Sequence, residues 1–244
     1  MNKAFFAGTL LSLSLASVYA QDPVYLIYSD RVPYTETSKD GDVQGVIADP
    51  VKQVFRRAKI DYQWRNVPIN RQLQIIENNQ EKACLIGFFK NPQRALLGKF
   101  TRAIYQDGPT IAVVASDNPQ LGDIKTIDDL LSNQKLILLN KSSYSYGAQV
   151  DKKIKQWDPT IELTTADNLH LFQMISYRRA DYFFLTLDEA MQLVRRFELN
   201  PHAYRYLSFP ELGSGNQRHI WCTRQVSDTT IEKLNKEIEK LTNK

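Results

Sequence analysis

The chain has 244 residues, of which 43% are hydrophobic and 24% charged, which is ordinary globular composition and excludes a disordered chain. The formal net charge is only +4, and paired arginines occur in three separate stretches, 56–57, 178–179 and 195–196. This mild and scattered charge excludes a nucleic-acid reader, because such proteins gather their cations into one stripe that follows the phosphates.

The first 20 residues form a segment of their own. A short basic start, Asn2 and Lys3, precedes the apolar run AFFAGTLLSLSLA, and small residues end the segment at Ala20. This pattern is typical of a secretory signal peptide, so we predict cleavage after Ala20 and a periplasmic location. An uncleaved anchor is the alternative, but the apolar run is shorter than the roughly 20 residues that span a bilayer.

From residue 23 to residue 89, strand and helix patterns alternate. Between the first strand and the first helix, DRVPYTETSKDGDVQG predicts a turn-rich loop. Asp49 and Asn70 are the expected N-caps of the two helices, with Pro50 in the first turn. The predicted strands are PVYLIYS (23–29), IDYQW (60–64) and KACLIGFF (82–89), and the predicted helices are ADPVKQVFRRA (48–58) and NRQLQIIENN (70–79).

After FTRAIYQDGP the alternation begins again. Thr126 and Asp129 have the spacing of a capping box at the start of the first helix in this half. The predicted strands are 110–115, 135–139, 160–165 and 180–186, and the predicted helices are 126–133, 140–157, 168–178 and 188–197. Two alternating series predict an α/β protein with two lobes, each a parallel sheet covered by helices.

The C-terminal part departs from the alternation. HAYRYLSF and RHIWCTRQV are predicted to be extended, with the glycine-rich turn ELGSGNQ between them. The final segment, 227–243, is predicted to be a helix with one apolar stripe made of Ile231, Leu234, Ile238 and Leu241. This stripe predicts docking on another part of the chain.

Cys84 and Cys222 each fall inside a predicted strand. An exported chain can oxidise them, but the sequence gives no geometry for a bond. We expect two buried free thiols.

Sequence motifs of enzymes are scarce. His170, His202 and His219 do not have the spacing of metal ligands, and the chain has no phosphate-cradling glycine loop, nucleophile elbow or CxxC pair. Adjacent carboxylates occur at helix starts, where the helix dipole alone explains them. We therefore expect no metal, no cofactor and no catalysis.

Polar residues follow several predicted strands. Arg94 comes after the strand 82–89, Ser142 and Ser143 after 135–139, and Thr186 and Asp188 at or after the end of 180–186. In a two-lobed α/β protein these strand ends face the cleft between the lobes. For the serines the alternative role is N-capping of the next helix, and for Arg94 it is a surface salt bridge.

The stretch NPQRALLGKFTRAIY resembles a segment of the family 3 extracellular solute-binding proteins. In that family an arginine precedes Phe-Ser or Phe-Thr and then a tyrosine at fixed spacing, and Arg94, Phe100, Thr101 and Tyr105 match it. The resemblance covers nearly the whole mature chain. It includes Pro33, Tyr34, Gly45 and Asp49 ahead of the first helix, and LNKSSYSYG, which is similar to a ligand-contacting segment of the second lobe.

The resemblance implies the two-lobed type II periplasmic-binding-protein fold with two hinge crossovers. The first lobe is expected to contain residues 21–104 and 225–244, and the second lobe residues 105–224. The crossovers are expected near RAIYQDG and TRQVS. Such a protein closes around a small ligand.

The resemblance also implies roles for single residues. In amino-acid-binding members the arginine at the place of Arg94 holds the ligand carboxylate through two parallel hydrogen bonds. We expect its stem to pack beneath Tyr34 or Tyr105. Gly87 and Phe88 stand where the family has a serine-rich strand end.

Where these members carry an acidic residue for the ligand's amino group, this chain has Thr186, with Asp188 two positions later. The ligand-binding set expected from the sequence is Arg94, Tyr34, Gly87, Phe88, Ser142, Ser143, Thr186 and Asp188.

The expected function is capture of a small polar, carboxylate-bearing and amino-acid-like solute by a monomer that serves an ABC-type permease. The alternatives are a same-fold enzyme such as a small-acid dehydratase, or a ligand-sensing receptor component. An enzyme requires an acid or base in the cleft, whereas a binding protein requires only closure. A purely structural interaction module would lack a polar cleft that closes.

Overall fold

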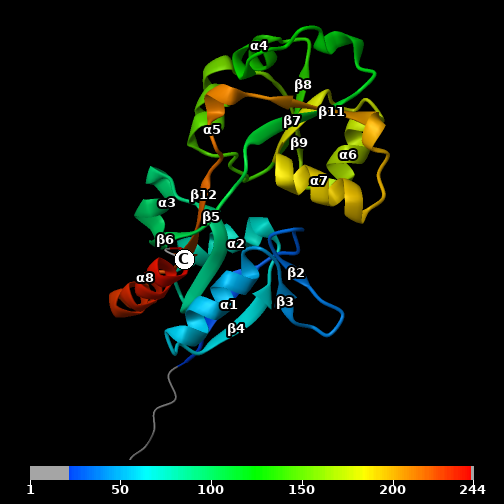
Figure 1. Cartoon of the computed structure of the whole chain (residues 1–244). Helices are drawn as coiled ribbons and strands as arrows, with labels where there is room; N and C mark the ends of the chain where they lie inside the picture. The colour runs from blue at the N-terminus through cyan, green and yellow to red at the C-terminus, as the bar shows by residue number, and fades with distance from the viewer. Residues whose placement is uncertain (1–21, 243–244) are drawn as a thin grey trace, which may run out of the picture.

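The computed structural model describes residues 22–242, so the predicted signal peptide, residues 1–20, lies outside the described residues. The chain forms two lobes, each built around a five-stranded sheet (Figure 1). A small hairpin of β2 (Glu36–Thr37) and β3 (Val43–Gln44) lies within the loop that was predicted to be turn-rich. Within residues 22–242, no helix has the length and apolar character needed to cross a membrane.

The sheet of the first lobe mixes strand directions. Its spatial order is β4 (Tyr62–Asn66), β1 (Val24–Tyr28), β5 (Ala83–Phe89), β12 (Gln217–Cys222) and β6 (Lys99–Gln106). β1 is parallel to β4 and β5, whereas β12 is antiparallel to both β5 and β6. The strands of the first predicted series, β1, β4 and β5, are parallel as expected, and the antiparallel strand β12 comes from the C-terminal part that departs from the alternation.

The sheet of the second lobe is also mixed. Its spatial order is β11 (Tyr204–Ser208), β7 (Thr110–Ala115), β10 (Tyr182–Thr186), β8 (Ile137–Lys141) and β9 (Thr160–Thr164). β8 is parallel to β9 and β10, and β7 is antiparallel to β10 and β11.

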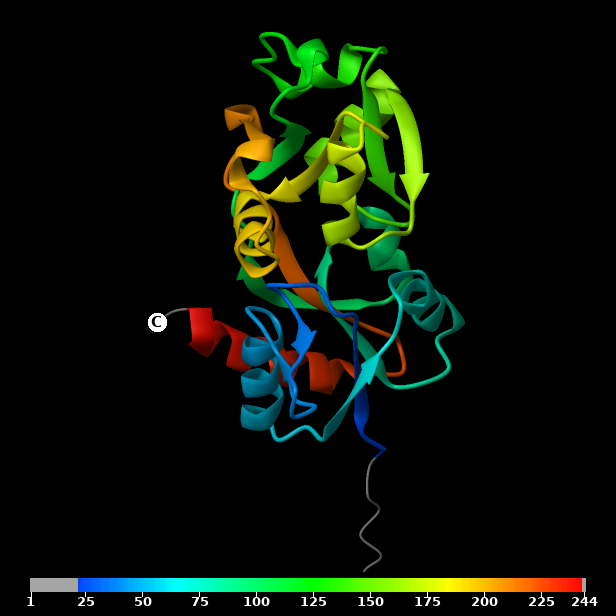
Figure 2. The same cartoon turned by 90° about the vertical axis from the view of Figure 1, so that its right-hand side faces the viewer.

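The chain crosses between the lobes twice, once after β6 and once after β11 (Figures 1 and 2). The two crossovers touch each other, because the backbone N–H of Asp107 donates to the carbonyl of Asn216 at 2.9 Å. The predicted lobe boundary at residue 224 needs correction, since β12 is a strand of the first sheet. The second crossover is residues 209–216, and the first lobe contains 22–106 and 217–242.

Helices of the first lobe cover both faces of its sheet. They are α1 (Ala48–Arg57), α2 (Ile69–Asn78), α3 (Pro92–Leu97) and α8 (Asp228–Thr242). The apolar stripe predicted for the last helix docks in the same core as Val51 and Phe55 of α1, with Leu241 at the edge of that core. On the opposite face, Ile76 of α2 belongs to a smaller cluster with Leu85 and Trp221.

The second lobe has the same layered construction. Its helices are α4 (Ile127–Ser132), α5 (Ala148–Trp157), α6 (Asn168–Ser176) and α7 (Leu187–Arg196). Two short 3-10 turns of this lobe are η1 (Pro119–Leu121) and η2 (Pro201–Ala203), and a third, η3 (Pro210–Leu212), lies in the second crossover. Leu130 of α4 and Val150 of α5 belong to one core cluster, whereas Phe172 of α6 and Leu193 of α7 belong to another.

Helix starts agree only in part with the sequence predictions. Thr126 and Asp129 form the predicted capping box. The N-caps expected at Asp49 and Asn70 are wrong, because the two helices begin one residue earlier than each of them, after Ile47 and Pro68. The carboxylate of Asp49 instead accepts a hydrogen bond from the backbone N–H of Gly45.

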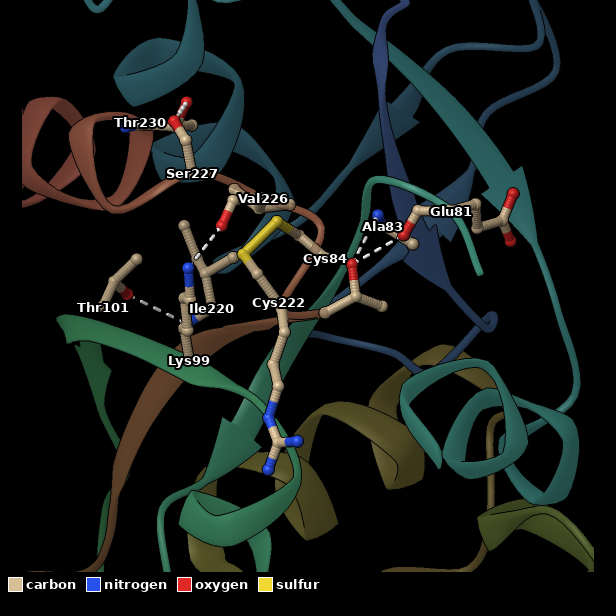
Figure 3. The surroundings of a disulfide bond; sticks show 12 residues. Glu81, Ala83, Cys84, Lys99, Thr101, Ile220, Cys222, Val226, Ser227 and Thr230 are labelled. Carbon is tan, nitrogen blue, oxygen red and sulfur yellow. Dashed lines mark hydrogen bonds between the residues drawn. A yellow bond between two sulfur atoms is a disulfide. The ribbon is translucent and has the colours of Figure 1, made fainter. Parts of the chain in front are cut away.

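Cys84 of β5 and Cys222 of β12 form a disulfide, so the expectation of two free thiols is wrong (Figure 3). The two residues stand directly opposite each other on adjacent antiparallel strands, with Cα atoms 3.9 Å apart. Both lie in the core cluster that contains α1 and α8. The bond therefore fixes the returning strand β12 inside the first lobe, although its two ends are 138 residues apart in the sequence.

Candidate functional site

A cavity of about 820 Å3 is lined by residues of both lobes. The first lobe contributes the carboxyl ends of β1 and β5 and the starts of α2 and α3. The second lobe contributes the carboxyl end of β8, the loops before α5 and α6, and one side of α7. In α/β proteins the crevice outside the carboxyl ends of parallel strands is the usual place for a ligand, and this cavity occupies that place.

Arg94 lines this cavity from the start of α3. The side chain of Asn91 caps the helix by accepting from the backbone N–H of Arg94 at 2.8 Å, and Pro92 occupies the first helical position. The segment that appears in the sequence as a turn is thus a helix start that fixes the backbone of the arginine. Its Nη1 atom donates to the carbonyl of Phe89 at 3.0 Å.

The guanidinium of Arg94 packs against aromatic rings and forms no ion pair within residues 22–242. It stands 5.1 Å from the ring centroid of Phe88 and 5.7 Å from that of Trp221. Burial lowers its pKa below the ordinary arginine value, while the more distant charge of Asp151 acts in the opposite direction. A half-buried cation of this kind has hydrogen-bonding capacity left for an anion.

Tyr34 also lines the cavity, but it is not the ring under Arg94. Two other arginines face its ring, Arg218 at 4.0 Å and Arg31 at 4.7 Å from the centroid. The expectation that Arg94 packs beneath Tyr34 or Tyr105 is therefore wrong. The hydroxyl of Tyr34 is hydrogen-bonded to the hydroxyl of Thr186 at 3.0 Å, across the two lobes.

Gly87, Phe88 and Ser143 line the cavity as well. Gly87 has a φ of +77°, and a Cβ there would approach Ile47 Cδ1 to 2.8 Å, so a side chain at this position would be strained. Its carbonyl oxygen accepts from Arg218 at 2.9 Å.

Three of the predicted site residues do not line the cavity: Ser142, Thr186 and Asp188. The hydroxyl of Thr186 is hydrogen-bonded to that of Tyr34, which lines the cavity. The same hydroxyl caps α7 by accepting from the backbone N–H of Glu189. Asp188 lies at the hinge, beside Gly108.

The serine-rich segment folds differently from the helix predicted over 140–157. The helix begins only at Ala148, and its N-cap is Gly147, so neither Ser142 nor Ser143 caps it. Asp151 holds the preceding turn by accepting from Ser145 Oγ at 2.5 Å and from the N–H of Tyr146 at 2.8 Å.

The pair of Arg31 and Glu189 connects the lobes beside the cavity. Arg31, in the loop after β1, donates two hydrogen bonds of 2.7 Å to the carboxylate of Glu189 on α7. Burial acts to lower the pKa of Arg31, but the charge and hydrogen bonds of Glu189, together with Tyr144 and Tyr34, act in the opposite direction, and the pKa lies well above the ordinary value. A second interlobe ion pair joins Arg196 of α7 to Glu36 of β2 at 2.6 Å.

Lys141, the last residue of β8, lines the cavity from the second lobe. Its Nζ atom donates to Asn168 Oδ1 at 3.0 Å and stands 5.5 Å from the ring centroid of Tyr144. Burial, and then the positive charge of Arg31, lower the pKa of Lys141 to about 8. No carboxylate within residues 22–242 forms an ion pair with it.

Arg218 lines the cavity from the start of β12. Its Nε atom donates to Asp107 Oδ1 at 2.6 Å, and both side chains are nearly or fully buried. This ion pair joins the returning strand to the first crossover.

Sequence reasoning missed Arg31, Lys141 and Arg218. Lys141 ends β8 and Arg31 lies in the loop after β1, and this position near the end of a strand is the available signal. Arg218 begins an antiparallel strand, so its place at the cavity follows only from the sheet pairing.

The assembled site is a cavity with cationic side chains set in largely apolar walls, and the walls belong to two bodies joined by two crossovers. It can enclose a small molecule between the lobes and present cationic side chains to it from both sides. Among residues 22–242, no group of three or more His, Cys, Asp or Glu side chains is arranged to hold a metal ion.

Solved structures share this two-lobed fold. An ancestral arginine-binding protein bound to arginine matches with a TM-score of 0.71 at 16% identity, over 91% of this chain and 92% of that one. The Salmonella typhimurium periplasmic binding protein described for its high arginine specificity matches with a TM-score of 0.68 at 16% identity, over 91% and 93%.

A third structure, from work on glutathione import via GshT and the cystine ABC importer TcyBC of Streptococcus mutans, has a TM-score of 0.72 at 15% identity, over 91% and 89%. At these identities the likeness shows the fold alone. No curated protein sequence matches the chain.

The family model described as bacterial extracellular solute-binding proteins, family 3, matches residues 24–244, which include both sheets, both crossovers and every residue of the cavity. The chain therefore belongs to the family 3 bacterial extracellular solute-binding proteins and is a solute-binding protein.

Proposed function

We propose that this protein captures a small carboxylate-bearing solute between its lobes and delivers it to an ABC-type permease. One observation carries the proposal: Arg94 lines the interlobe cavity, is fixed by the start of α3, and has no ion-pair partner within residues 22–242. A guanidinium matches a carboxylate with two parallel hydrogen bonds. Each hydrogen bond to a charged group contributes about 1.5 to 3 kcal/mol.

The proposal includes binding without chemistry by a monomer in the periplasm, after removal of residues 1–20. Family membership supports export and capture of a small molecule. The importer in the Streptococcus mutans work supports a permease as the partner. N-terminal sequencing of the exported form is expected to begin at Gln21, and an intact N-terminus in the membrane fraction would contradict cleavage.

Calorimetry tests the role of Arg94. The protein is titrated with the standard amino acids and with straight-chain mono- and dicarboxylates, and the tightest binder is then titrated into the variants Arg94→Lys and Arg94→Ala. Lysine keeps the charge but loses the planar fork, so we expect at least tenfold weaker binding, or about 1.4 kcal/mol.

The matched control is Arg102→Lys, since Arg102 is exposed on β6, outside the cavity. We expect this variant to bind like the wild type. Wild-type affinity in both Arg94 variants would contradict the proposed role.

A further inference from the structure

The cavity carries two cationic side chains that the protein itself does not neutralise. Five cations line it, and three of them form ion pairs: Arg31 with Glu189, Arg196 with Glu36, and Arg218 with Asp107. Arg94 of the first lobe and Lys141 of the second have no ion-pair partner within residues 22–242. The two unpaired cations belong to different lobes.

Lys141 is held in position by a chain of hydrogen bonds. Its Nζ atom donates to Asn168 Oδ1 at 3.0 Å, and Asn168 Nδ2 donates to the buried carboxylate of Glu189. Glu189 in turn accepts both hydrogen bonds of Arg31. One carbonyl oxygen does not neutralise an ammonium group, so Lys141 keeps donors for a further acceptor.

No buried carboxylate at the cavity is left for an ammonium group of a ligand. Glu189 is fully buried and is occupied by Arg31 and Asn168. Thr186, at the start of α7 three residues before Glu189, is not an acid, and its hydroxyl is hydrogen-bonded to that of Tyr34.

The other carboxylates that line the cavity are either paired or exposed. Glu36 pairs with Arg196, and Asp30 and Asp167 lie at exposed positions, where an ammonium group would stay solvated. Asp30 accepts from the backbone N–H of Thr37, and Asp167 accepts from that of His170. Asp151 lies near Arg94 but accepts hydrogen bonds within its own turn.

Resting on the proposed function, we infer that the solute is a small dicarboxylate that lacks an ammonium group. One carboxylate binds Arg94 and the other binds Lys141, so the two charges of the ligand match the two unpaired cations and bridge the lobes. An α-amino acid would bury an ammonium group where no buried carboxylate is free to pair with it, and an unpaired buried charge is strongly disfavoured. The lowered pKa of Lys141 is consistent with a cation that lacks its counter-ion.

Matched acids test this inference by calorimetry. Each set has one carbon skeleton: succinate, butyrate and aspartate; glutarate, pentanoate and glutamate; adipate, hexanoate and 2-aminoadipate. For the skeleton that fits best, the dicarboxylate is expected to bind at least tenfold more tightly than both the monocarboxylate and the amino acid. Rejection of the amino acid follows from the missing acceptor for its ammonium group.

Variants separate the two cations. Lys141→Gln is expected to remove the preference for the dicarboxylate over the monocarboxylate. Arg94→Lys is expected to weaken the binding of both acids. Lys141→Arg keeps a cation and is expected to retain the preference. Lys152→Gln, which changes an exposed lysine of α5, is the control and is expected to behave like the wild type. Thermal melts verify that every variant is folded.

Each outcome distinguishes the inference from the proposed function. If aspartate or glutamate binds more tightly than its dicarboxylate and Arg94→Lys still weakens it, the dicarboxylate inference is overturned and the proposed function stands. If Lys141→Gln loses the same affinity for the monocarboxylate as for the dicarboxylate, Lys141 has only a structural role, and the inference is overturned. If no acid binds, or if Arg94→Lys and Arg94→Ala change nothing, the proposed function is overturned together with it.

Discussion

The guanidinium of Arg31 in the first lobe holds the carboxylate of Glu189 in the second lobe through two hydrogen bonds of 2.7 Å. The side chain of Glu189 is 0% exposed and that of Arg31 is 21% exposed. Because the partners belong to different lobes, the pair exists only while the lobes are together. This ion pair therefore stabilises the closed arrangement over an open one.

Glu189→Gln keeps the shape of the side chain but removes its charge. Arg31 then loses its buried partner, and we expect the closed arrangement to lose about 3 kcal/mol relative to an open one. Small-angle scattering of the unliganded variant is expected to give a larger radius of gyration than the wild type. The control is Glu162→Gln on β9, an exposed residue of the same lobe. The same radius of gyration for both variants would contradict a role of the Arg31–Glu189 ion pair in holding the lobes together.

Lys141 predicts a pH dependence of stability. Its pKa is about 8 in the folded chain and 10.5 in its ordinary state, so between these values the unfolded chain binds a proton that the folded chain does not. The contribution of Lys141 to stability therefore rises with pH over that window, by on the order of 1 kcal/mol per pH unit. Arg31, Glu189 and Asp167 are the charged groups that act on it.

Urea unfolding of the wild type and of Lys141→Met between pH 7 and pH 10 measures this contribution. The wild type is expected to gain stability relative to the variant as the pH rises above 8. A difference between the two proteins that does not change with pH would show that the pKa of Lys141 is not lowered.

The disulfide predicts a large loss of stability on reduction. Cys84 and Cys222 enclose more than half of the chain, with a sequence separation of 138 residues. Closing a loop of that size stabilises a fold by about 2 to 5 kcal/mol. Urea unfolding of the double variant Cys84→Ala, Cys222→Ala is expected to show that loss, while affinity for the ligand changes little because the bond lies within one lobe. Two alkylatable thiols in the purified native protein would refute the bond.

Gly215 allows the two crossovers to approach each other. Its φ is +97°, and a Cβ at this position would collide with the carbonyl oxygens of Asp107 and Gly108. Gly215→Ala is therefore expected to lower the free energy of unfolding by about 1 to 3 kcal/mol. The control is Gly213→Ala, which also replaces a positive-φ glycine of the same crossover but meets no atom within 4 Å. If both variants lose the same free energy of unfolding, the close packing of the crossovers does not contribute to stability.

The sequence predicts most elements of this fold but not how they pair. Apolar patterns locate strands such as β5 and β12 because those patterns are local. Nothing local in RHIWCTRQV indicates that it pairs with β5, more than 100 residues earlier. For this reason the expected lobe boundary at residue 224 and the expected free thiols of Cys84 and Cys222 are both wrong.

The candidate site was predictable where a motif or a strand end identifies a residue. Arg94 follows from its spacing to Phe100, and the structure places it at the cavity. Lys141 ends a strand, but a single lysine carries no motif, and its lack of a carboxylate partner is visible only in three dimensions. The expected helix over 140–157 is wrong at its start, because Asp151 holds a turn before it and the helix begins only at Ala148.

A crystal structure of the protein with the tightest-binding acid tests the central claim most directly. We expect the ligand in the interlobe cavity, with one carboxylate accepting two hydrogen bonds of about 2.7 to 2.9 Å from the guanidinium of Arg94. A ligand bound outside the cavity, or inside it with its carboxylate away from Arg94, would contradict the account.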